Sequence, residues 1–409
     1  MCSEEVCDPK RIKAKSSWIV GDSTIEYCLA RKVESHCKLQ FSRDILIAVI
    51  ICNLCKAAAM VGALWLQREP SLVTTGDAIS SWLARRDETT ANQCMAKAND
   101  IVCKRSYMRL PVSDFERDGG RDPIAFNSSK TKRWHHAIKR RRWAIVLTLC
   151  TVTLAVAGRL LKIALYNLIE DTENTVQSTG FGAIRPGAMV DIGLPSSGNS
   201  ALLANVLIAN LPQLIFSCLY LLYNGLFTSM CLAHEYSSYS IIRRPLRVTS
   251  PRGKQRSTHW LHLPYFYSIP LLAASALLHW SISQSIFFVG IDLYDGDEVE
   301  SLVGLGFSIQ PIILDIVLGS CMLFVVVGMG FRKLHGKMPL ASSNSMVISA
   351  ACHRPDEDTD AAVKPLMWGE VYANAESEVG HCTFTSMEVT VPVEGKMYAG
   401  IRRRMAVAG

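Results

Sequence analysis

Long runs of apolar residues separated by polar segments are the dominant pattern of this chain. A run of about 20 apolar residues crosses the roughly 30 Å hydrocarbon layer of a bilayer as an α-helix. Runs of that length occupy residues 45–67, 143–169, 201–233, 265–291 and 309–331. The pattern predicts an all-α integral membrane protein, a helical bundle of about five transmembrane helices with a soluble cytoplasmic tail.

The polar segments define the other parts of the chain. We expect a polar N-terminal arm at 1–44, a polar connector at 68–142 that ends in a basic cluster, and a cytoplasmic tail at 334–409. The four apolar runs between them form the expected transmembrane core, 143–333. The first run contains Lys56 at its middle, where a charge costs about 2.5–3.5 kcal/mol on insertion scales. This lysine leaves open whether the first run spans the membrane, and with it the side of the N-terminus.

Charged residues at the ends of the apolar runs predict the orientation of the helices. Seven Lys or Arg residues lie between Lys130 and Arg142, and the segment between the third and fourth runs is also basic. Residues 292–301 instead carry five acidic residues and no basic one. Because cytoplasmic loops carry an excess of Lys and Arg, both basic segments and the C-terminus are predicted to be cytoplasmic.

The partners follow from where this charge lies. The net charge is +7, and many basic residues stand directly beside apolar runs. We therefore expect the basic loops to contact the bilayer and its anionic headgroups, and we expect no nucleic-acid partner. A homo- or hetero-oligomer in the membrane and a plasma-membrane location both agree with the sequence, which determines neither.

A stripe of polar residues follows one face of the third apolar run. Steps of three and four residues place its members within a narrow arc of a helix: Asn210, Gln213, Ser217, Tyr220, Asn224 and Thr228. The fourth and fifth runs offer counterparts in Ser275, His279 and Asp315. Two interpretations compete, a hydrated path or pocket between these helices and interhelical hydrogen bonding that holds the bundle together. The second requires fewer assumptions.

Cysteine and histidine residues form a mirrored pair in the tail, Cys352-His353 and His381-Cys382. Both residue types bind zinc, but structural zinc sites usually space their ligands two to four residues apart. We predict no cofactor and keep zinc at these four residues as the alternative. Cys52 and Cys55 form a Cys-x-x-Cys pair, which inside an apolar helix favours two packed thiols over redox chemistry.

Enzyme motifs are incomplete in this sequence. His234-Glu235 begins the zinc-protease pattern HExxH, but Ser238 occupies the position of the second histidine. Enzymatic activity stays undecided, and the sequence favours its absence. The leading hypothesis is a non-enzymatic structural or scaffold component of a membrane. The alternative is a transporter or channel-like protein that uses the polar face between the last three apolar helices.

Several long motifs occur in the order of a known family, among them LLANVLIANLPQLIFSCLYLLYNGLFTSM, RRPLRVTSPRGKQRST and ISAACHRPDED. With them, the C-terminal two-thirds of the chain resembles a fungal multi-pass membrane protein family of unknown function, the domain of unknown function 6536 type. The family's N-terminal part carries further spans, so this chain looks shortened or diverged there. The resemblance implies a fungal source and an integral membrane location, and it supplies no activity and no catalytic residue.

Overall fold

The computed structural model of the 409-residue chain describes residues 18–20, 23–25, 43–66, 72–91, 93–97, 123–127, 132–170, 181, 189–190, 193, 198–259, 263–295, 298–341, 344–372 and 378–400. Most of the predicted N-terminal arm lies outside these described residues. So does much of the polar connector, including the first part of its basic cluster at 130–131.

The chain forms two compact units, residues 1–70 and residues 71–409. The first unit contains the antiparallel strand pair β1 (Trp18–Val20) and β2 (Ser23–Ile25) and the helix α2 (Arg43–Leu66). α2 corresponds to the first apolar run. The side chains of Lys56, Cys52 and Cys55 are exposed on it, and the two cysteines are free thiols.

Five helices in the described part of the chain are long and apolar enough to cross a membrane. Besides α2, they are α6 (Arg140–Glu170), α7 (Gly198–Ser238), α8 (Tyr265–Ser285) and α9 (Ile309–Gly330). The prediction of a mostly helical chain with five such helices is confirmed. The all-α class is wrong, because the chain also forms several small sheets.

Helices α6 to α9 pack against one another along two apolar clusters. One cluster joins Val146 of α6, Leu226 and Met230 of α7 and Val326 of α9, and a second contains Ala164 and Ile312. Close approach of the helices allows van der Waals contacts between them, which are a main source of attraction between apolar helices.

Small residues and a hydrogen bond bring α9 close to its neighbours. A Cβ atom built on Gly319 would lie 3.1 Å from the side chain of Leu154 on α6. The hydroxyl of Tyr223 on α7 donates to the carbonyl of Met322 on α9 at 3.1 Å. These contacts hold α9 closely against α6 and α7.

A β-hairpin extends the last two helices at one end of the bundle. β7 (Ile286–Asp295) follows α8 without a break and pairs antiparallel with β8 (Glu298–Phe307), from Ile286 opposite Phe307 to Asp295 opposite Glu298. β4 (Met189–Val190), which lies between α6 and α7, pairs with β8. The fourth apolar run, taken as helical to residue 291, therefore changes to strand after Ser285.

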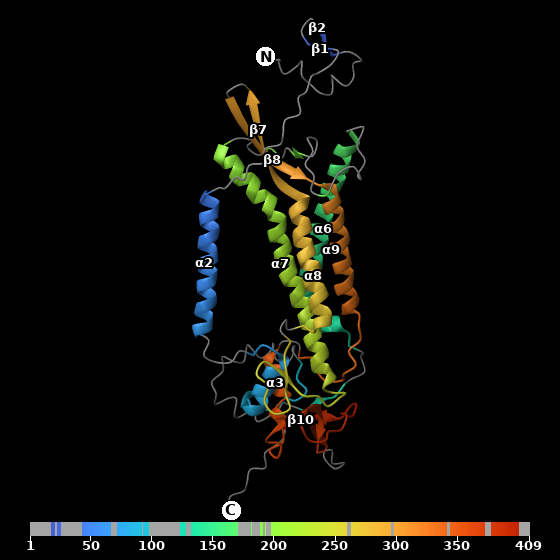
Figure 1. Cartoon of the computed structure of the whole chain (residues 1–409). Helices are drawn as coiled ribbons and strands as arrows, with labels where there is room; N and C mark the ends of the chain where they lie inside the picture. The colour runs from blue at the N-terminus through green and yellow to red at the C-terminus, as the bar shows by residue number, and fades with distance from the viewer. Residues whose placement is uncertain are drawn as a thin grey trace, which may run out of the picture. The chain divides into compact units, whose positions relative to one another are not determined.

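The polar segments build a folded domain at the other end of these helices (Figure 1). Its four-stranded sheet has the order β3-β11-β10-β9, in which only β10 and β11 are parallel. The strands are β3 (Ile124–Ala125), β9 (Met367–Val371), β10 (Val379–Thr385) and β11 (Met397–Tyr398). The other elements are α3 (Thr75–Ala84), α10 (Ser345–Ala350), the pair β5 (Arg247–Val248) and β6 (Arg256–Ser257), and the 3-10 turns η1 (Glu88–Thr90), η3 (Trp134–Ala137) and η6 (Ala361–Val363).

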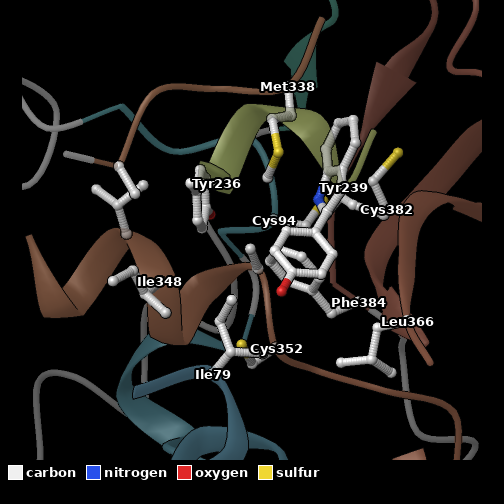
Figure 2. Close-up of a cluster of buried hydrophobic side chains, with 14 of the residues drawn as sticks. Ile79, Cys94, Tyr236, Tyr239, Met338, Ile348, Cys352, Leu366, Cys382 and Phe384 are labelled. Atoms are coloured by element: carbon white, nitrogen blue, oxygen red, sulfur yellow. The ribbon is translucent and has the colours of Figure 1, made fainter. Parts of the chain in front are cut away.

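Three segments that are far apart in sequence form the core of this domain (Figure 2). Ile79 and Cys94 come from the connector before α6, Tyr236 and Tyr239 from the end of α7, and Phe384 from the tail. Phe384 packs edge-on against both tyrosines, with ring centroids 5.6 and 5.7 Å apart. The connector, the loop after α7 and the tail are thus one domain and not separate polar segments.

Candidate functional site

The polar stripe of α7 lies beside the packed face of the helix and not on it. The buried face of this part of α7 contains Tyr223, Leu226, Phe227 and Met230. The stripe is on the flank of this face: Asn210 is exposed, and the other five members, Gln213, Ser217, Tyr220, Asn224 and Thr228, are half-buried. The helix therefore packs through aromatic and aliphatic side chains, and the stripe borders that contact.

Two members of the stripe use their donors within α7 itself. The amide of Asn210 donates to the carbonyl of Val206 at 2.8 Å, and the hydroxyl of Ser217 donates to the carbonyl of Gln213 at 2.9 Å. Such bonds to the preceding turn satisfy a polar side chain in an apolar surrounding without a neighbouring helix. They reduce the need for a polar counterpart on α8 or α9.

The predicted counterparts on α8 and α9 have separate surroundings. Ser275 is buried, and the ring of His279 packs edge-on against Phe216 of α7, with centroids 4.8 Å apart. Asp315 instead lies beside the hydroxyls of Ser281 and Ser285 on α8. Its buried Oδ1 atom has no hydrogen-bond partner among the described residues.

The tail cysteines and histidines are placed as core residues. Cys352 and Cys382 are buried in the domain core, where burial raises the pKa of both thiols. The ring nitrogens of His381 lie 2.9 Å from the carbonyl oxygen of Ala399 and 2.8 Å from that of His353. Nε2 of His353 lies 2.9 Å from the hydroxyl of Thr90.

These contacts do not favour zinc at the four tail residues. Zinc binds the thiolate form of cysteine, which burial disfavours here, and a free ring nitrogen of histidine. In the part of the chain that the structure describes, no group of three His, Cys, Asp or Glu residues is arranged to hold a metal ion. The mirrored Cys-His pairs therefore pack together and link the tail to the connector.

A cavity of 240 Å³ lies where the domain meets the helices. Its walls come from the last turns of α7, the start of α8, η3 and the loop that joins α7 to α8. It is lined by Trp134, Thr228, Cys231, Leu232, His234, Glu235, Arg244, Arg247, His259, Leu263, Pro264 and Tyr267. Thr228 is the one member of the predicted stripe that reaches this cavity.

Two arginines line the cavity and a third, Arg332, lies beside its wall, and one carboxylate balances part of their charge. Arg247 forms a two-point ion pair with Glu235, through Nε at 3.0 Å and a terminal nitrogen at 2.5 Å. The guanidinium of Arg332 lies 4.8 Å over the ring of Trp134 and donates to the hydroxyl of Tyr267 at 2.9 Å. Trp134 is 1% exposed and also stacks on His234.

The sequence hypothesis did not identify this cavity. Trp134 was part of a basic run, and Arg244 and Arg247 were part of a basic loop more than a hundred residues later. Only the association of η3 with the ends of α7 and α9 brings them together, through Trp134 N–H donating to the carbonyl of Arg332 at 2.9 Å. His234-Glu235, which matched only the beginning of a protease motif, lies in its wall.

Residues 114–379 match a family described as Domain of unknown function (DUF8419). The chain belongs to the DUF8419 family. The match runs from the connector through α6 to α9 and ends at the first residue of β10, so it includes the cavity and the helices that frame it. The match confirms a domain of unknown function and does not confirm the 6536 type to which the sequence showed a resemblance. No curated protein and no solved structure matches the chain.

Proposed function

We propose that this DUF8419 protein is a multi-pass integral membrane protein with a non-enzymatic structural or scaffold role. Helices α6 to α9 cross the bilayer, and the folded domain lies on the cytoplasmic side. A fungal source and a plasma-membrane location belong to the same proposal, and so does contact of the basic loops with anionic headgroups. The DUF8419 family and the 6536 type are then distantly similar families.

The observation that carries the proposal is the mixed origin of the domain core. Segments before α6, after α7 and after α9 share this core, so they lie on one side of any membrane that α6 to α9 cross. β4, which precedes α7, pairs with β8, which precedes α9, so the intervening segments also share a side. Both the shared core and the β4–β8 pairing are expected if the chain crosses the membrane four times in succession, in α6, α7, α8 and α9. A domain that closes over the ends of four helices supports a structural role.

Labelling of single introduced cysteines in intact cells tests the membrane arrangement. Glu298→Cys in the hairpin should react with a membrane-impermeant maleimide from outside. Arg252→Cys, in the loop after α7, should react only after the membrane is permeabilised. The unsubstituted chain gives the background from its own cysteines. The reverse pattern, or an N-glycan on Asn127 of the sequon Asn127-Ser128-Ser129, would show that the domain is not cytoplasmic.

The alternative is a transporter or channel-like protein. The observation that favours it is the buried Oδ1 atom of Asp315, which has no hydrogen-bond partner in the part of the chain that the structure describes. Carboxylates inside a membrane bundle often mark ion or proton pathways. Proton or cation flux into vesicles with the reconstituted protein decides between the two roles. Flux that is lost in Asp315→Asn or His279→Leu, with folding intact, would support transport. No flux in the parent, with reduced thermal stability of Asn224→Leu, would support the structural role.

A further inference from the structure

The cavity between the domain and the helix ends has an excess of positive charge. Arg247 and Glu235 neutralise each other as a two-point pair. Arg244 and the neighbouring Arg332 then remain as cations, with His234 and His259 as additional nitrogen donors or acceptors. Arginine is the side chain best suited to bind phosphate, because its planar fork can donate two parallel hydrogen bonds.

An unused donor in the wall of the cavity points to a ligand as well. Trp134 lines the cavity and is almost fully buried, yet its Nε1 atom has no hydrogen-bond partner among the described residues. An indole N–H can only donate, and a buried donor without an acceptor is destabilising. An anion bound in the cavity within reach of this atom would supply the missing acceptor.

The cavity also lies at the expected depth of lipid headgroups. α8 has 21 residues and α9 has 22, so each is about 32–33 Å long at 1.5 Å per residue, close to the roughly 30 Å hydrocarbon layer. The cavity borders the start of α8 at Pro264 and Tyr267, and Arg332 follows the end of α9. This step rests on the proposed membrane location.

We propose that this cavity binds a phosphate monoester through Arg244 and the N–H of Trp134, with Arg332, which lies over the Trp134 ring, adding positive charge beside it. Its volume of 240 Å³ is below the roughly 300–1,000 Å³ of sites for drug-sized ligands, so it suits a small anionic group. Two sources carry this chemistry: the headgroup of an anionic phospholipid such as phosphatidic acid, and a soluble phosphate monoester.

Calorimetric titration of the full chain in uncharged detergent tests the site. The probes are phosphatidic acid, phosphatidylcholine with the same acyl chains, and glycerol 3-phosphate. We expect one phosphatidic acid per chain and no saturable binding of phosphatidylcholine. Arg244→Gln should weaken binding on the order of tenfold, because a charge-assisted contact is lost. Trp134→Phe should weaken it several-fold, because it removes the indole N–H and retains an aromatic ring.

Matched controls separate the site from general effects of charge and packing. Arg252→Gln removes one exposed arginine from the same loop, away from the cavity lining, and should leave the affinity unchanged. Trp368→Phe changes another buried tryptophan whose Nε1 lacks a partner among the described residues, in the domain core, and should also have no effect. If Arg244→Gln does not fold, the difference in affinity between Trp134→Phe and Trp368→Phe still shows whether the ligand binds in the cavity.

The outcomes identify the source or reject the site. Binding of phosphatidic acid alone assigns a lipid headgroup, and equal binding of glycerol 3-phosphate assigns a soluble ligand. Failure of both probes to bind, or equal losses in Arg244→Gln and Arg252→Gln, would overturn the proposal. The soluble probe needs no bilayer, so its result is independent of the cysteine labelling that tests the membrane arrangement.

Discussion

Buried polar residues stabilise the fold of the tail, and Asp358 is one of the most densely bonded of them. Its carboxylate accepts hydrogen bonds from the hydroxyls of Thr385 and Ser386, both at 2.5 Å, and from the N–H of Ser386 at 2.7 Å. Burial would raise the pKa of Asp358, but these hydrogen bonds outweigh it and hold the pKa below its usual value. The folded domain therefore depends on the charged form of this side chain.

Asp358→Asn should lower the free energy of unfolding by about 1–3 kcal/mol at neutral pH, because it removes hydrogen bonds to a charged acceptor. Thermal unfolding of the full chain in detergent, followed by circular dichroism, measures the change. Asp360→Asn is the control, since its ion pair with Lys364 spans 3.4 Å between exposed side chains. Exposed pairs contribute at most about 1 kcal/mol. Equal losses in the two variants would contradict the role given to Asp358.

The buried histidines predict a separate response to pH. Burial, with a further contribution from nearby His381, lowers the pKa of His353 to about 4. The pKa of His381 is also lowered, mainly by burial. In the unfolded chain a histidine titrates near pH 6.5, so between about pH 6.5 and 4 the unfolded state binds more protons. Stability is therefore complete above that range and falls as the pH decreases through it.

His353→Gln should flatten this pH dependence between about pH 6.5 and 4, because one group that titrates in the unfolded state is removed. The melting temperature of the full chain, measured at several pH values, tests this. His335→Gln changes an exposed histidine and should leave the slope as it is. An unchanged slope in His353→Gln would show that other groups cause the loss of stability.

At the scale of elements, α3 is fixed to the loop after α7 by a close backbone approach. The helix starts with a capping box in which Thr74 and Asp77 exchange hydrogen bonds, and the Thr74 hydroxyl lies 2.7 Å from the carbonyl oxygen of Arg247. A Cβ atom built on Gly76 would lie 2.1 Å from that same oxygen. Only glycine therefore fits between the first turn of α3 and β5.

Gly76→Ala should destabilise the domain by about 1–3 kcal/mol, the usual cost of overpacking, because the obstructing atom belongs to the backbone. Gly328→Ala is the matched control, since a Cβ atom there would meet no atom within 4 Å and alanine favours the helix. Thermal melts of both variants give the comparison. Similar melting temperatures for Gly76→Ala and the parent would show that α3 can shift away from β5.

At the scale of the whole molecule, folding of the connector depends on the tail. Ile79 and Leu83 of α3 are fully buried in a core that also contains tail residues such as Ile348. Arg354 of the tail also donates to the carbonyl of Leu83 at 3.0 Å. Removal of the tail would expose this apolar surface.

If α6 to α9 cross the membrane as proposed, a chain that ends at Lys333 should remain in membranes but lose protease resistance in residues 72–91 and 93–97. Limited proteolysis of the two chains in membranes, with mass-spectrometric mapping of the cuts, measures this. Co-expression of residues 334–409 as a separate chain should restore protection if the segments reassociate. Equal protection of the connector in both chains would mean that it folds without the tail.

Much of the helical bundle could be predicted from local sequence. Apolar runs of spanning length fixed the existence of the helices, since length and hydropathy are local properties. The sequence did not reveal where α8 ends, because residues 286–291 are apolar and an apolar run is compatible with a helix and with a strand. Pairing with β8 made it a strand, which its β-branched and aromatic residues favour. The stripe on α7 was visible in the sequence, but its position beside the packed face depended on which neighbours α7 has.

The sequence by itself determined which segments are apolar enough to cross a membrane and where positive charge is concentrated. Both are sums over neighbouring residues, so no knowledge of the fold was needed. Only the tertiary structure decided that three polar segments share one core and that Trp134, Arg244 and Arg247 line one cavity. Those contacts join residues far apart in the chain, and packing and backbone hydrogen bonds between the segments select them, which no local pattern records.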